Sequence, residues 1–217
     1  MSLPCSEAHH KQDYIKRYVI FIIGIVIMSF GIAFCIKGDL GTTPISSLPY
    51  VTSLISGLSV GTTTIIMHIS LILLQMIILR RNYNPIQLLQ LPVALIFGWT
   101  IDLALWVIKG LAPESYIFRW LVCLIGIFLV AVGVACEVIG DVVTLAGEGL
   151  IIAICKAFNL PFPPVKVIFD VFLVALSVAL SLVFLGGIHG VREGTVAAAF
   201  LVGVLSKPMI KRFRLAS

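Results

Sequence analysis

The segments RYVIFIIGIVIMSFGIAFCIKGD, at residues 17–39, and RWLVCLIGIFLVAVGVACEVIGD, at residues 119–141, are two copies of one apolar segment. At an offset of 102 residues, 8 of their 23 positions are identical. The shared positions include two glycines within the apolar run, the arginine before it and the Gly-Asp pair after it, none of which hydropathy alone requires. This pattern predicts a gene duplication and a chain that consists of two related halves.

The composition excludes a water-soluble fold. The chain is 60% hydrophobic and 12% charged, with a mean hydropathy of +1.14, and 217 residues cannot enclose that much apolar surface in one core. A membrane-spanning helix needs about 20 mainly apolar residues. The segments that meet this need are 18–36, 62–79, 87–108, 120–136, 165–185 and the shorter 194–206. We therefore expect an all-α integral membrane protein with six transmembrane helices.

Each half also contains a short helix. Thr43 and Pro44 are typical of a helix start, and Gly57 is typical of its end, which predicts a half-helix at 44–57. The second half has its counterpart at 148–158, before a proline-rich break. If these segments crossed the membrane, Arg80 and Arg81 would lie on the side opposite to the basic N-terminus, so charge placement favours segments that are broken or re-entrant.

Three spans per half predict that the second half enters the bilayer from the opposite face. Such inverted-topology repeats are characteristic of secondary transporters and some channels. The predicted organisation is a cytoplasmic N-terminal tail at 1–17, repeat 1 at 18–109, repeat 2 at 118–207 and a basic cytoplasmic tail at 208–217.

The net charge of +5 predicts orientation. The cations gather in the N-terminal tail, at Arg80–Arg81 and in the C-terminal tail, and six spans place all three groups on one face. The positive-inside rule makes that face cytoplasmic, together with both termini. We expect membrane lipid as a partner and no nucleic acid. One chain is long enough to enclose a path, but small transporters often pair, so a homodimer stays open.

The chain lacks the common signatures of catalysis and of metal binding. Its five cysteines lie mostly in or beside apolar spans without a C-x-x-C spacing, as small apolar residues do. A Gly-x-Ser-x-Gly turn and a His-Glu-x-x-His pair are both missing from the sequence. We therefore expect no enzyme, no cofactor and no metal.

Carboxylates inside a membrane cost from about 3 to more than 10 kcal/mol, so those near the spans are candidates for a polar path. Asp39 and Asp141 end the two duplicated segments. They are either interfacial acids that cap the next segment or a symmetry-related pair that flanks gates or binds a coupling cation. Asp102 interrupts the third span, and an interfacial role explains it least well.

A titratable group occupies a matched depth in the second span of each half, His68 in the first and Asp170 in the second. Lys166 precedes Asp170 by four residues, which favours an ion pair over a proton relay. His68 is either a packing residue or a proton-coupling group, because histidine ordinarily titrates near neutral pH.

The half-helix starts add further polar groups. Glu148 opens the second half-helix, either as a simple capping charge or as a ligand, and hydroxyls at both breaks suit a solvated pathway. The candidate pathway residues are Asp39, Thr42, Thr43, His68, Asp102, Asp141, Thr144, Glu148 and Asp170.

The segment 36–46, IKGDLGTTPIS, resembles the Ala-Asp-Leu-Gly-Thr-Ser-Pro motif that follows the first span in the bacterial YczE/YyaS/YitT family of multi-pass membrane proteins. The stretches 147–150, GEGL, and 187–195, GIHGVREGT, are similar to the YczE-like branch. The likeness covers most of residues 15–205, with Gly38 in place of the common alanine and Thr43 in place of the common serine. It implies a bacterial inner-membrane protein for which transport has been suggested.

Repeat symmetry and intramembrane charge together predict a small secondary transporter or facilitator. It would move a small polar solute or ion through the interface of the two repeats. The alternatives are a channel and a regulatory or scaffold protein that moves nothing. The sequence leaves open the charge of the solute and the identity of a coupling ion.

Overall fold

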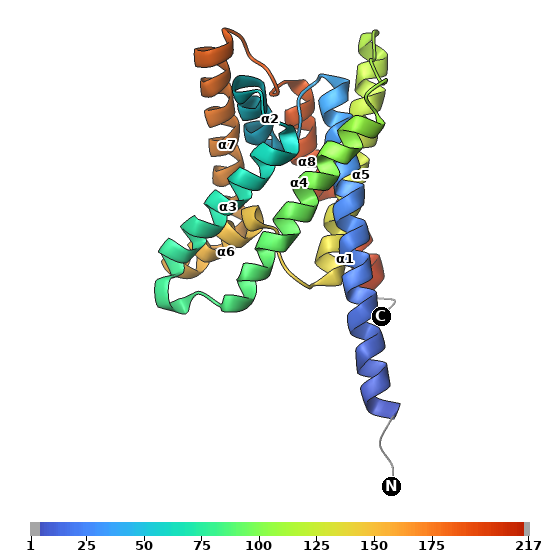
Figure 1. Ribbon diagram of the computed structural model, residues 1–217, viewed down its shortest axis with the longest axis vertical. Coiled ribbons are helices and arrows are strands. Elements are labelled where there is room, and N and C mark those ends of the chain that lie inside the picture. The colour runs from blue at the N-terminus through green and yellow to red at the C-terminus, as the bar shows by residue number, and fades with distance from the viewer. Residues whose placement is uncertain (1–4, 215–217) are drawn as a thin grey trace.

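The computed structural model describes residues 5–214, and every regular element in that part of the chain is helical (Figure 1). The helices are α1 (Cys5–Gly38), α2 (Pro44–Ser56), α3 (Val60–Leu79), α4 (Gln90–Val107), α5 (Tyr116–Gly140), α6 (Ala146–Phe158), α7 (Phe162–Leu185) and α8 (Glu193–Arg214), with short 3-10 helices η1 (Arg80–Asn82) and η2 (Pro85–Leu89) between α3 and α4.

Six of these helices are long and apolar enough to cross a membrane. They are Ile15–Gly38, Val60–Leu79, Pro85–Val107, Tyr116–Gly140, Phe162–Leu185 and Glu193–Arg212. The prediction of an all-α fold with six spans is therefore confirmed, and the chain is a multi-pass membrane protein. The helices extend into both predicted tails. Residues 5–17 belong to α1, and α8 continues through Pro208 to Arg214.

The short helices α2 and α6 have 13 residues each and do not cross the molecule. α2 begins at Pro44 after an extended Thr43 and ends at Gly57, whose φ of 73° gives the left-handed turn that glycine adopts without strain. α1 ends and α3 begins at the upper end of the molecule in Figure 1, so the chain between them enters and returns on one side. At the lower end α6 connects α5 to α7 in the same manner.

The two duplicated segments pack against each other as α1 and α5. Gly24 on α1 lies against Gly133 on α5, and Gly31 lies against Gly126. Because one number rises as the other falls, the two helices are antiparallel. A Cβ added at Gly31 would lie 2.6 Å from the backbone nitrogen of Val130. The backbones therefore approach as closely as small residues allow in membrane helix pairs.

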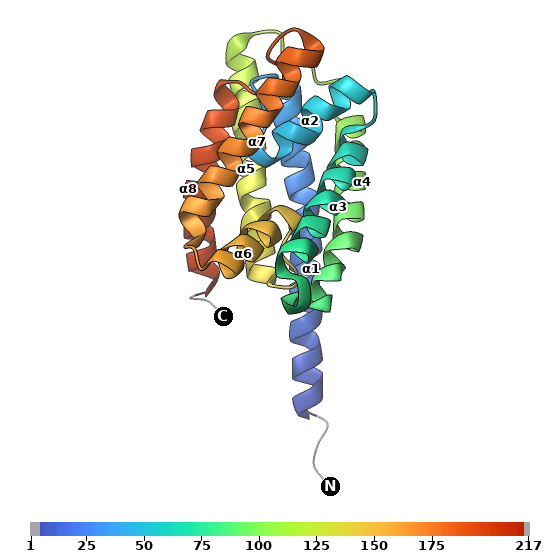
Figure 2. The same ribbon diagram turned by 90° about the vertical axis from the view of Figure 1, so that its left-hand side faces the viewer.

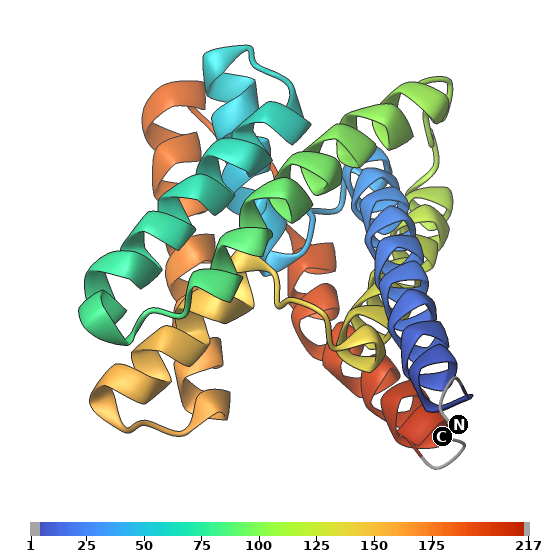
Figure 3. The same ribbon diagram turned by 60° about the horizontal axis from the view of Figure 1, so that its bottom comes forward.

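The other helices surround this pair in a pattern that mostly repeats (Figures 2 and 3). α4 packs on α1 as α8 packs on α5. Each short helix packs on the second long helix of its own half and of the other half, so that α2 contacts α3 and α7, and α6 contacts α7 and α3. One pair departs from the pattern, because α3 packs along α4 whereas α7 and α8 barely touch.

We expect Gly31→Leu to lower the free energy of unfolding by about 1 to 3 kcal/mol, because its side chain would overlap the α5 backbone. Thermal unfolding in detergent measures the change. Gly203→Ala is the matched control, since a Cβ there meets nothing within 4 Å and alanine favours a helix over glycine. Equal unfolding temperatures for the two variants would contradict the close packing.

Candidate functional site

Each end of the α1–α5 pair is held by an ion pair between the two halves. Arg17 Nη2 lies 2.9 Å from Asp141 Oδ2, and Arg119 Nη1 lies 2.8 Å from Asp39 Oδ2. Both aspartates directly follow a helix and have left-handed backbones, with φ of 52° for Asp39 and 47° for Asp141. Arg192 also donates to the Asp39 carbonyl at 3.0 Å. Ion pairing and helix ending therefore account for both acids.

Asp102 is not a free carboxylate on a polar path. Its Oδ1 accepts a hydrogen bond from the Gly61 backbone nitrogen at 2.7 Å, and its Oδ2 accepts one from Ser59 Oγ at 2.6 Å. The first N–H groups of a helix lack partners within the helix and favour a negative charge. Asp102 therefore caps α3 from α4, a contact across 41 residues that the sequence alone does not reveal.

A cavity of about 280 Å³ lies between the two halves. We call it the central cavity. It is lined by the start of α2, the middle of α1, α3, α4 and α5, the start of α6 and the facing sides of α7 and α8. Both half-helix starts contribute, with Thr43 to Ser46 from one and Leu145 and Glu148 from the other. Its titratable lining residues are His68, Glu137, Glu148, Lys166, Asp170 and Lys207.

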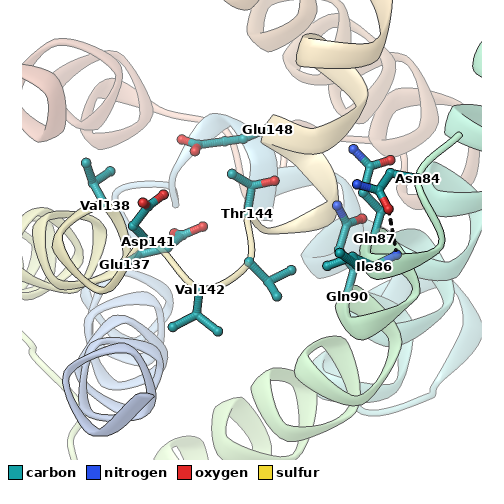
Figure 4. Close-up of a pocket in the computed structure, with 11 residues that line it drawn as sticks. Asn84, Ile86, Gln87, Gln90, Glu137, Val138, Asp141, Val142, Thr144 and Glu148 are labelled. Atoms are coloured by element: carbon teal, nitrogen blue, oxygen red, sulfur yellow. Dashed lines mark hydrogen bonds between the residues drawn. The ribbon is translucent and has the colours of Figure 1, made fainter. Parts of the chain in front are cut away.

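A second cavity, of about 310 Å³, is lined by the α3–α4 connection, the start of α4, the end of α5 and the start of α6 (Figure 4). In Figure 1 these elements lie at the lower end of the molecule. We call this cavity the end cavity. On one side Figure 4 shows amide side chains from the α3–α4 connection and the start of α4, and on the other side carboxylates from α5 and α6. Its polar lining residues are Asn84, Gln87, Gln90, Glu137, Asp141, Thr144 and Glu148.

Among the described residues, Glu137 and Glu148 alone line both cavities. Glu137 is 4% exposed, and its Oε1 accepts a hydrogen bond from the Leu145 backbone nitrogen at 2.9 Å. Glu148 stands in the first turn of α6, half-buried. The two carboxylates therefore mark the boundary between the end cavity and the interior of the protein.

Sequence reasoning missed Glu137 for two reasons. The span predicted at 120–136 stopped one residue before it, and the matching position of the first half holds Cys35. A search for features shared by both copies therefore passes over it. The available signal was an acid surrounded by apolar residues one turn before the Gly140–Asp141 corner, inside a run long enough to continue the span.

His68 and the Lys166–Asp170 pair line the central cavity. The titratable groups that the sequence places at matched positions in α3 and α7 therefore share one cavity. His68 is 3% exposed, its ring lies 5.7 Å from that of Phe97, and its Nδ1 has no hydrogen-bond partner among the described residues. Lys166 Nζ lies 3.4 Å from Asp170 Oδ2, which is the i, i+4 ion pair that the spacing favours. His68 is therefore a buried polar residue of the cavity wall, with one ring nitrogen unpartnered among the described residues.

The three threonines have different surroundings. Thr43 lines the central cavity and donates to Ser46 Oγ at 2.9 Å. Thr144 is exposed and lines the end cavity. Thr42 is buried, and its hydroxyl has no partner among the residues that the structure describes. Asp39 and Asp102, in contrast, line neither cavity.

Two buried amides position the start of α6 beside the end cavity. Gln75 Nε2 donates to Gln90 Oε1 at 3.1 Å and to the Ala146 carbonyl at 3.0 Å. Gly149 faces both amides, and a Cβ there would lie 2.6 Å from Gln90 Nε2. This contact holds α6, and with it Glu148, against α3 and α4. Sequence reasoning did not single out these glutamines.

The fold and these cavities define a multi-pass helical membrane protein with an internal polar site. Over residues 15–211 the chain matches the family described as "Family of unknown function (DUF6198)", and it belongs to that family. It is 36% identical over 120 residues to the protein described as "Uncharacterized protein YyaS" from Bacillus subtilis (strain 168). That match covers 55% of this chain and 58% of the relative, and it confirms the expected resemblance to YyaS. No solved structure matches the chain.

We expect the Arg17–Asp141 pair to contribute about 1 kcal/mol or less to the free energy of unfolding, because its side chains are 45% and 80% exposed. A double-mutant cycle with Arg17→Gln and Asp141→Asn, read by chemical unfolding in detergent, measures this coupling. A coupling of several kcal/mol would contradict the interpretation that water screens the attraction between these two exposed side chains.

Proposed function

We propose that this protein is a small secondary transporter or facilitator that moves a small, positively charged solute across the bacterial inner membrane. The solute passes between the end cavity and the central cavity at Glu137 and Glu148. The observation that carries the proposal is that, in the part of the chain that the structure describes, these two carboxylates alone line both cavities. A charge buried in a membrane protein is costly, and where one occurs it generally marks a path for an ion, a proton or a substrate.

The arrangement of the helices supports transport. α1 and α5 are antiparallel, and each half directs the start of one short helix at the central cavity. Inverted repeats with broken helices that meet at a central site are the common architecture of secondary transporters. We infer that the two halves are inverted-topology repeats whose relative motion opens the site to one side at a time.

The charges at the junction favour a cation. The end cavity is lined by Glu137, Asp141 and Glu148, and no lysine, arginine or histidine is among its lining residues. Asp141 is paired with Arg17, and in the central cavity Asp170 is paired with Lys166. Glu137 and Glu148 are left without an ion-pair partner among the described residues. Clefts lined by one sign of charge concentrate solutes of the opposite sign.

Glu137 can bind a proton and a cationic solute in turn. Its one hydrogen bond within the described chain, from Leu145, leaves the second carboxylate oxygen free. The other titratable groups that line the central cavity are Glu148 on α6, Lys166 and Asp170 on α7, His68 on α3 and Lys207 on α8. A single carboxylate that holds either a proton or the solute, never both, exchanges one for the other across the membrane.

The cavities favour a transporter over a channel. Toward the upper end of the molecule the central cavity is lined by the start of α2, and neither cavity is lined by the connections 57–59, 108–115 and 186–192. A site reached from one side only is what alternating access requires, whereas an open channel needs a continuous passage. Saturable flux that is stimulated by solute on the opposite side distinguishes the two.

We expect both termini to be cytoplasmic, because the start of α1, the helix η1 and the end of α8, which carry most of the basic residues outside the spans, lie at the lower end in Figure 1. A green fluorescent protein fused after Ser217 should fluoresce, and alkaline phosphatase at the same place should be inactive. The control is fusion after Gly110, between α4 and α5, which should give the opposite pair of signals. Matching signals at both sites would contradict this topology.

Flux in liposomes tests the function. Protein reconstituted into vesicles that hold an acidic lumen and a trapped pH dye should release protons when external Na⁺, K⁺ or tetramethylammonium is added. We expect Glu137→Gln to reduce this release at least tenfold, because the amide cannot exchange a proton.

Two control variants should release protons at the wild-type rate. Glu114→Gln changes an exposed carboxylate in the α4–α5 connection, and Asp39→Asn changes an acid outside both cavities. Wild-type vesicles that release no more protons than protein-free vesicles, with every cation tested, would overturn the proposed function.

A further inference from the structure

The two halves differ most where the second and third long helices of each half meet. α3 packs closely along α4, because Gly61 and Gly98 face each other and Asp102 binds the start of α3. The matched pair in the second half is α7 and α8, which barely touch (Figure 3). We call the line along which two such helices meet a seam. The α3–α4 seam is closed, and the α7–α8 seam is open.

The sequence explains why the second seam stays open. At the repeat offset of 102, Gly61 corresponds to Pro163, and at the offset of 103 that applies to the last span, Gly98 corresponds to Leu201 and Asp102 to Leu205. None of the three features that close the first seam has an equivalent. The side chain of Leu201 also prevents the close backbone approach that the glycines allow.

The central cavity extends into the open seam. Its lining includes Lys166 and Asp170 on α7, and Ala199, Gly203 and Ser206 on α8. A Cβ added at Gly203 would meet no atom within 4 Å, so the space beside it is empty of protein. The cavity that holds His68 and Glu137 is therefore continuous with the gap between these two helices.

The gap faces the hydrocarbon of the bilayer. Large apolar side chains on both bordering helices are more than half exposed, among them Val167 and Val171 on α7 and Phe200 and Val204 on α8. In a membrane-spanning helix, such side chains are in contact with lipid. A molecule dissolved in the bilayer can therefore reach the gap without passing through water.

We infer that the gap between α7 and α8 is a lateral entrance, through which an organic cation with an apolar body passes from the lipid into the central cavity. This inference rests on the proposed function and names the class of solute. The charged end would meet Glu137 and Glu148, and the ring of His68 forms part of the same cavity wall.

The walls of the cavity fit an apolar body. Away from its charged groups the cavity is lined mainly by apolar side chains such as Met28, Ile32, Phe97 and Val130. Its volume of about 280 Å³ lies near the lower end of the range for small-molecule sites, about 300 to 1,000 Å³, which limits the solute to a small amphiphile.

Two cations with the same head group test this entrance. Tetramethylammonium is confined to water, whereas hexyltrimethylammonium carries the same charge on a chain that enters the bilayer. In the proton-release assay we expect wild-type protein to reach half-maximal rate at a concentration at least tenfold lower for hexyltrimethylammonium. Gly203→Trp fills the gap, and it should reduce the hexyltrimethylammonium rate at least fivefold more than it reduces the tetramethylammonium rate.

Val204→Trp is the matched control, because its side chain faces lipid one residue away and lies outside the cavity lining. It should leave both rates unchanged, and unfolding temperatures of both variants show whether they are folded. Equal effects of the two tryptophans, equal losses for both cations in Gly203→Trp, or no preference for the hexyl chain would overturn the lateral entrance while the proposed function stands. Such a result is also expected if a second copy of the chain covers the gap. If wild-type protein exchanges neither cation nor any alkali-metal ion, the proposed function fails first.

Discussion

The close approach of α1 and α5 is the contact on which the rest of the structure depends. Gly24 and Gly31 on one helix meet Gly133 and Gly126 on the other, so that backbone lies against backbone over the length of the duplicated segment. In a membrane there is little hydrophobic drive between helices, and packing at short range has to provide the association. The antiparallel pair then fixes where α4 and α8 lie, and α4 in turn positions α3, against which both short helices pack.

Sequence patterns were sufficient for the parts of the fold that depend on local chemistry. Apolar length predicts the six spans, and Pro44 with Gly57 delimits α2. The same patterns could not reveal partners distant in the chain. The role of Asp102 becomes clear only when α3 lies beside α4 and its Gly61 nitrogen donates to the carboxylate. The role of Gln75 likewise depends on its hydrogen bonds to Gln90 and Ala146, which are distant in the chain.

The candidate site was predicted less well than the fold, because it lies where the two halves differ. Symmetry drew attention to Asp39 and Asp141, which exist in both copies and which the arginines of the opposite copy neutralise. Glu137 has no such counterpart, since the first copy has Cys35 in its place. The closed and open seams follow the same rule. What the halves share builds the scaffold, and what they do not share provides the polar junction and the gap.

The reciprocal ion pairs also indicate how such a protein arose. Arg17 finds its aspartate in the second copy, and Arg119 finds its aspartate in the first. A polypeptide of half this length would carry one arginine and one Gly-Asp corner and could satisfy them only with another molecule lying antiparallel to it. If the two halves are inverted repeats, as we propose, the ancestor would have inserted into the bilayer in both orientations and assembled as an antiparallel pair, and fusion of two genes would have fixed one orientation for each half.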